Sequence, residues 1–226
     1  MGRRGAVVGK CASAVRGAAP LESRSLEAFL VSTGIVALAE MGDKTQLLSL
    51  VLAARFRKPW PIVWGILVAT LANHALAGAV GSWVTHVLGP EVLRWVLGLS
   101  FIAMAAWMLV PDKLDDDEAP GAPRLGVFGA TLVAFFLAEM GDKTQVATVM
   151  LAAQYQAWAA VVAGTTLGMM LANAPVVWFG ERITRRVPIK LVHTIGAVIF
   201  LVLGVLALLD WGGRARASAQ TLSLGA

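Results

Sequence analysis

Eight residues, AEMGDKTQ, occur twice in this chain, at residues 39–46 and again at residues 138–145. Each copy lies inside an apolar stretch long enough to cross a bilayer, which takes roughly 18 residues. Each copy therefore brings two carboxylates and one ammonium group into hydrocarbon, where a charged side chain costs roughly 2.5–3.5 kcal/mol at the bilayer centre. We interpret the two clusters as one cation site between two halves of a transporter.

The composition is that of a polytopic membrane protein. Hydrophobic residues make up 58% of the 226 residues and charged residues 15%, with a mean hydropathy of +0.72. Soluble domains carry about 25% charged residues. The formal net charge is +5, and basic loops that face the cytoplasm explain it better than a nucleic-acid partner does. The single cysteine, Cys11, excludes an internal disulfide.

The apolar segments predict an all-α membrane protein with six transmembrane helices. The predicted spans cover residues 26–54, 60–88, 92–110, 125–153, 157–180 and 191–209. They divide the chain into a basic tail or targeting segment (1–24), a first three-helix repeat (25–110), an acidic linker (111–124), a second three-helix repeat (125–210) and a C-terminal tail (211–226).

The likeness between the halves extends beyond the octapeptide, because Leu-Ala-Asn at residues 71–73 recurs at residues 171–173. Each half holds an odd number of spans, so the second half must begin on the opposite side of the membrane. The two halves are then inverted repeats with the identical octapeptides facing each other. Lys and Arg occur in the connections after the first, third and fifth spans, which predicts that these connections are cytoplasmic.

The acids of the octapeptide are the predicted metal ligands. Glu40 and Asp43 are three residues apart and would share one face of a continuous helix, as would Glu139 and Asp142. Brought together, the four carboxylates would surround one ion, and such hard oxygen ligands suit Ca²⁺, Mn²⁺ or Mg²⁺. The octapeptide holds no Cys or His, which disfavours zinc and copper.

Neighbouring polar residues are expected to support this site. The candidates for additional neutral ligands are Thr45, Gln46, Asn73, Thr144, Gln145 and Asn173. Lys44 and Lys143 each follow a glutamate of the octapeptide by four residues, which favours ion pairs that offset acidic charge in the metal-free state. Gly42 and Gly141 let a facing helix come close or let the helix open locally. Protons and metal would compete for the same carboxylates, which is the minimal basis for cation/proton exchange.

Structural roles compete with these functional ones. Both clusters could be buried salt bridges that fix helix packing, although two identical copies with an extra Asp each disfavour this. His74 either lines the pathway or is a hydrogen-bonded packing residue. Gly164 and Gly168 form a small-xxx-small pair that predicts close helix packing.

The duplicated pattern Glu-x-Gly-Asp-Lys/Arg-Thr/Ser resembles the Gdt family of cation/proton exchangers, and the resemblance covers about residues 26–210. That family includes Golgi manganese and calcium transporters, chloroplast relatives and bacterial manganese exporters. The resemblance implies that Glu40, Asp43, Glu139 and Asp142 bind the cation, with Mn²⁺ as the first candidate and Ca²⁺ as the second. The short loops resemble those of bacterial family members in the inner membrane. The resemblance implies that the chain is embedded in the lipid bilayer there. It is compatible with a monomer or a homo-oligomer.

The hypothesis is thus a secondary antiporter, not an enzyme, that needs no cofactor and exports a divalent cation in exchange for protons. Alternatives are an exporter of an organic cation such as a basic amino acid, an intramembrane metalloenzyme that uses the acids for general acid/base chemistry, or a channel.

Overall fold

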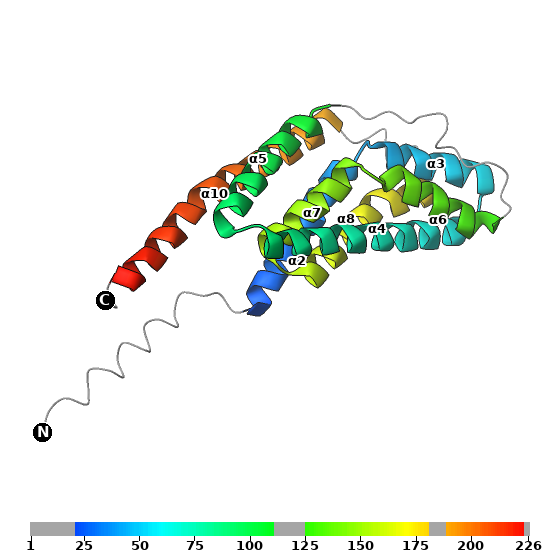
Figure 1. The fold of residues 1–226 in the computed structure, drawn as a ribbon. Helices are drawn as coiled ribbons and strands as arrows, with labels where there is room; N and C mark the ends of the chain where they lie inside the picture. Colours follow the sequence, from blue (N-terminus) through cyan, green and yellow to red (C-terminus); the bar gives the residue numbers. More distant parts are fainter. Residues whose placement is uncertain (1–20, 111–124, 181–188, 224–226) are drawn as a thin grey trace, which may run out of the picture.

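The computed structural model describes residues 21–110, 125–180 and 189–223, and every regular element in these stretches is an α-helix. The helices are α2 (Leu21–Glu40), α3 (Lys44–Phe56), α4 (Pro59–Val87), α5 (Pro90–Met108), α6 (Gly126–Glu139), α7 (Lys143–Tyr155), α8 (Trp158–Phe179) and α10 (Ile189–Ser223). The all-α prediction is therefore confirmed for the described part of the chain (Figure 1). The acidic linker and most of the N-terminal basic segment lie outside the described residues. Helix α10 continues past Asp210 into the predicted C-terminal tail.

Both octapeptides interrupt a helix. Helix α2 ends at Glu40 and α3 begins at Lys44, with a bend of 69° between them. In the second half, α6 ends at Glu139 and α7 begins at Lys143. The sequence placed each octapeptide inside one apolar span and allowed the helix to open at its glycine; each break contains that glycine with positive φ.

Five segments have the length and apolar composition of membrane spans. Helices α4, α5, α8 and residues 190–209 of α10 each qualify alone, and α2 with α3 qualifies as one bent span. Helix α6 is apolar but has only 14 residues. The described helices thus support four spans, or five with the bent pair, where the sequence predicted six.

The two halves pack against each other reciprocally. Helix α2 lies against α8 and α6 lies against α4, while α3 contacts α8 and α7 contacts α4. Helices α5 and α10 form a separate pair beside these helices (Figure 1), with the rings of Phe101 and Phe200 6.1 Å apart. The halves are therefore interleaved, and the two octapeptides meet inside the bundle.

Glycines allow the closest of these approaches. A Cβ built on Gly164 would lie 2.5 Å from the backbone oxygen of Phe29, and one built on Gly168 would lie 2.6 Å from that of Thr33. Both oxygens belong to α2, so the predicted small-xxx-small pair does serve helix packing, between α8 and α2. This contact fixes the position of the helix that ends at Glu40.

Candidate metal centre

The two helix breaks are built alike. Gly42 adopts a φ of 82° and precedes Asp43, the N-cap residue of α3. Gly141 adopts a φ of 81° and precedes Asp142, the N-cap residue of α7. A left-handed residue cannot continue a right-handed helix, and glycine takes this conformation without a Cβ clash. The local opening that the glycines allowed is therefore present in both halves.

A glutamine caps each break. The backbone N–H of Gly42 donates to Oε1 of Gln46 over 3.0 Å, and that of Gly141 donates to Oε1 of Gln145 over 2.7 Å. These are the amide oxygens that the sequence suggested as cation ligands, and here they accept hydrogen bonds from the backbone. The Gly-x-x-x-Gln spacing, present in both octapeptides, is a sequence signal for this cap that the predicted ligand role of the glutamines overlooked.

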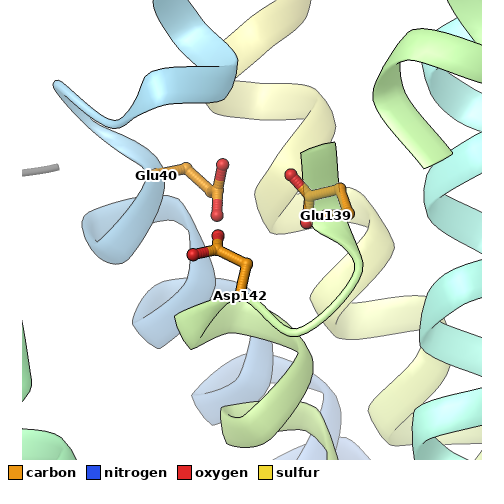
Figure 2. A group of neighbouring side chains, drawn as sticks. All are labelled: Glu40, Glu139 and Asp142. Carbon is orange, nitrogen blue, oxygen red and sulfur yellow. The ribbon is translucent and has the colours of Figure 1, made fainter. Parts of the chain in front are cut away.

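Three carboxylates from the two halves converge on one point. Glu40, Glu139 and Asp142 each offer an oxygen, and these three oxygens lie within 4.8 Å of one another (Figure 2). The two glutamates are fully buried and Asp142 is 7% exposed. Asp43 is also buried, but it does not belong to this group. The structure thus brings together three of the four predicted acids.

The helix-face geometry expected for the acids was wrong. Glu40 is the last residue of α2 and Asp43 precedes α3, so the two side chains do not extend from one continuous helix. The i,i+4 geometry expected between Glu40 and Lys44 is interrupted by the same break, because Glu40 ends α2 and Lys44 begins α3. Lys143 is buried and donates to the backbone oxygen of Val110 over 2.7 Å.

The hydrogen bonds around the two glutamates differ sharply. Thr45 Oγ1 donates to Oε2 of Glu40 over 2.6 Å, and Thr144 Oγ1 donates to Oε1 of the same carboxylate. Within the described residues, neither oxygen of Glu139 has a hydrogen-bond partner. Both predicted threonines therefore serve one glutamate, although each belongs to a different octapeptide.

The two predicted asparagines are buried, and their amide groups hydrogen-bond within α8 and to the neighbouring helices α3 and α6. Asn173 accepts from Ser49 Oγ over 3.0 Å and donates to the backbone oxygen of Met169 over 3.2 Å. Asn73 donates to the backbone oxygen of Phe136 over 3.1 Å. Ser49, whose hydroxyl joins α3 to α8, was not among the residues predicted for the site.

Two histidines lie near this region. His74 is buried, with Nδ1 3.4 Å from Oγ1 of Thr166, which agrees with a packing role. His193 of α10 lies with Nε2 2.9 Å from the backbone oxygen of Met41, inside the first helix break. The ring must donate there, because a carbonyl oxygen only accepts. No sequence pattern selects His193 as a candidate site residue.

The chemistry of the cluster is that of a hard-cation site. A buried carboxylate without hydrogen-bond donors is costly unless a cation or a proton neutralises it, and Glu139 is such a group. The three converging acids supply only oxygen ligands, which suit Mn²⁺, Ca²⁺ and Mg²⁺. The arrangement can bind a divalent cation or protons at the same oxygens.

The family-model match and similar known proteins point to the same family. The model of the family "Divalent cation/proton antiporter GDT1" matches residues 28–116 and again residues 127–214. A protein of Vibrio cholerae named "Putative manganese exporter" is 51% identical over 181 residues, covering 80% of this chain and 90% of that protein. A "GDT1-like protein" of the cyanobacterium Synechocystis is 29% identical, covering 80% of this chain and 97% of its own length. A rice "GDT1-like protein 4" is 27% identical over 214 residues. No solved structure gives a significant match.

Proposed function

This chain belongs to the GDT1 family of divalent cation/proton antiporters, and we propose that it exports Mn²⁺ in exchange for protons. The observation that carries the proposal is the convergence of Glu40, Glu139 and Asp142 from both halves within 4.8 Å. The name of the Vibrio cholerae relative supports Mn²⁺ as the cargo. Ca²⁺ meets the same ligand chemistry and is the second candidate.

The cation site consists of these three carboxylates, and Asp43, buried at the first helix break, is the fourth acid of the two octapeptides. Exchange follows from competition, because a carboxylate oxygen that holds Mn²⁺ cannot also hold a proton. When the metal leaves, protons neutralise the crowded acids and make the empty site stable in the membrane. Mn²⁺ binding therefore displaces protons.

The architecture that fits this function is six spans in two inverted repeats. Each broken pair, α2 with α3 and α6 with α7, counts as one span whose break lies near the bilayer midplane. The half-helices α3 and α7 direct their N-termini toward the breaks, a construction known from inverted-repeat transporters. The reciprocal packing of the halves supports alternating access, in which the site opens to one side of the membrane at a time. The membrane is the plasma membrane of a bacterium, as the bacterial relative suggests.

The test is flux in proteoliposomes. The purified protein is reconstituted with a pH-sensitive dye inside, and Mn²⁺ is added outside while internal pH and Mn²⁺ are recorded. We expect Mn²⁺ to enter while protons leave, and we expect Glu139→Gln to abolish both movements. Glu91→Gln is the matched control, because Glu91 is an exposed acid in the first turn of α5.

Other outcomes would overturn the proposal in distinct ways. Mn²⁺ flux without proton movement would indicate a channel. Proton movement driven by lysine or arginine, and none by Mn²⁺ or Ca²⁺, would indicate an organic-cation exporter. Equal Mn²⁺ flux through the wild type and Glu139→Gln would show that transport does not require the carboxylate cluster.

A further inference from the structure

Ser49 joins the half-helix α3 to the opposite half of the protein. Its hydroxyl donates to Oδ1 of Asn173 in α8 over 3.0 Å, and both residues are buried. One helical turn earlier, Nε2 of Gln46 donates to the backbone oxygen of Ala172 over 3.2 Å. Two hydrogen bonds thus hold α3 against α8 beside the carboxylate cluster.

The other half contains the same donors and acceptors. Gln145 and Thr148 stand 99 residues after Gln46 and Ser49, and the Ala-Asn pair at residues 72–73 stands 100 residues before residues 172–173. Helix α7 packs against α4 as α3 packs against α8. The sequence therefore provides a complete counterpart of the contact, made by Thr148 and Asn73.

This counterpart is not formed in the described state. Thr148 Oγ1 donates to the backbone oxygen of Thr144 in its own helix over 2.8 Å. Asn73 is fully buried, and its Oδ1 has no hydrogen-bond partner within the described residues. A buried amide oxygen without a donor is costly, so the acceptor that Thr148 would need is present and unused.

We propose that the Ser49–Asn173 and Thr148–Asn73 pairs are alternating latches, one closed in each of the two states of the transport cycle. The inference rests on the proposed function, since it assumes that the site opens to each side in turn. When a latch opens, its hydroxyl turns back to the backbone oxygen four residues earlier, as Thr148 does here. Each hydroxyl thus has a partner in both states, which keeps the energy difference between the states small.

The four residues are positioning residues, because the latches hold α3 and α7, whose N-cap residues are the acids Asp43 and Asp142. Ser49→Ala removes the closed latch and shifts the protein toward the opposite state. Thr148→Val removes the other latch and shifts it toward the described state. One hydrogen bond changes such an equilibrium by about two- to tenfold. The two substitutions must therefore change the apparent Mn²⁺ affinities of the two membrane faces in opposite directions.

The experiment measures the half-saturating Mn²⁺ concentration on each face of oriented proteoliposomes. We expect Ser49→Ala to change the ratio of these two concentrations by about two- to tenfold relative to the wild type, and Thr148→Val to change it by a similar factor in the opposite direction. The double variant should return near the wild-type ratio. Ser49→Thr and Thr148→Ser keep the hydroxyl and should hold the ratio, which separates the latch from a general loss of folding.

Several results would overturn the latches while leaving the antiporter intact. One such result is a ratio of half-saturating Mn²⁺ concentrations that Thr148→Val leaves unchanged. Another is a ratio that Thr148→Val shifts in the same direction as Ser49→Ala. Both count only if the wild type exchanges Mn²⁺ for protons. Absence of Mn²⁺/proton exchange in the wild type would instead overturn the proposed function, and with it the cycle in which the latches act.

Discussion

Gly168→Ala should push α2 away from α8 and displace a predicted ligand of the metal site. A Cβ at this position would lie 2.6 Å from the backbone oxygen of Thr33 and 2.9 Å from the backbone nitrogen of Ala37. Ordinary contacts begin at 3.4 Å, so α2 would have to retreat by roughly 0.8 Å. Both atoms are backbone, so no side-chain rotation relieves the clash. Glu40 lies three residues beyond Ala37 and would move with the helix.

Overpacking of this kind costs about 1–3 kcal/mol, against a gain of about 1 kcal/mol from replacing a helical glycine by alanine. The net loss of up to about 2 kcal/mol should lower the melting temperature by up to about 8 °C in a chain of this size. Tryptophan fluorescence of the detergent-purified protein would follow unfolding, and titration calorimetry would report weaker Mn²⁺ binding. Gly34→Ala is the matched control on α2, because a Cβ there meets nothing within 4 Å. It should leave the melting temperature unchanged or raised.

The reasoning fails if Gly168→Ala melts with or above the wild type and binds Mn²⁺ equally well. That result would mean that α2 and α8 separate without cost, and that the position of Glu40 does not depend on this contact. A loss of stability equal in Gly34→Ala and Gly168→Ala would also contradict it, because only one of the two added methyl groups meets backbone atoms.

Three further predictions concern the acids and the helix breaks. Asp142→Asn should weaken Mn²⁺ binding about tenfold more than Asp43→Asn, since only Asp142 belongs to the cluster of three carboxylates; equal losses by calorimetry would refute this. Thr144→Val removes one of the two threonine hydroxyls that donate to Glu40 and should lower stability by about 1.5–3 kcal/mol, whereas Thr144→Ser should not; thermal unfolding of both variants decides. Gly141→Ala should cost about 1–2 kcal/mol from its φ of 81° alone, because a Cβ there meets nothing within 4 Å; a melting temperature equal to that of the wild type would argue against a fixed break.

Hydropathy and the positions of prolines and polar connections were sufficient to predict the unbroken helices. The predicted spans at residues 60–88, 92–110 and 157–180 agree within two residues at each end with α4 (Pro59–Val87), α5 (Pro90–Met108) and α8 (Trp158–Phe179). These helices are apolar over most of their length, and prolines or a short polar connection mark their ends. Their boundaries are therefore local properties that a sequence displays directly.

The helix breaks were harder to predict, because apolar composition does not distinguish a continuous helix from a broken one. A single glycine is tolerated inside many helices, and the hydrogen bond from Gly42 to Gln46 becomes visible only once the backbone has turned. The convergence of acids was predictable from the duplication, since identical polar clusters in hydrocarbon must find partners. Which three of the four acids converge is not predictable from the duplication, because Asp43 and Asp142 occupy the same position in identical octapeptides and only Asp142 joins the group.

Two identical octapeptides occupy unlike surroundings, and this asymmetry is the most informative feature of the site. The sequence of the octapeptide cannot itself prefer Glu40 over Glu139 as the acceptor of both threonine hydroxyls. The preference must come from residues outside it, where the halves differ by small changes such as Ser49 in place of Thr148. Two conformations of the protein that form the same kinds of hydrogen bond, each in a different half, differ little in free energy, because the contributions of these bonds nearly cancel. A transporter that must occupy both states in turn requires such a near balance, and a duplicated motif held by slightly different neighbours provides it.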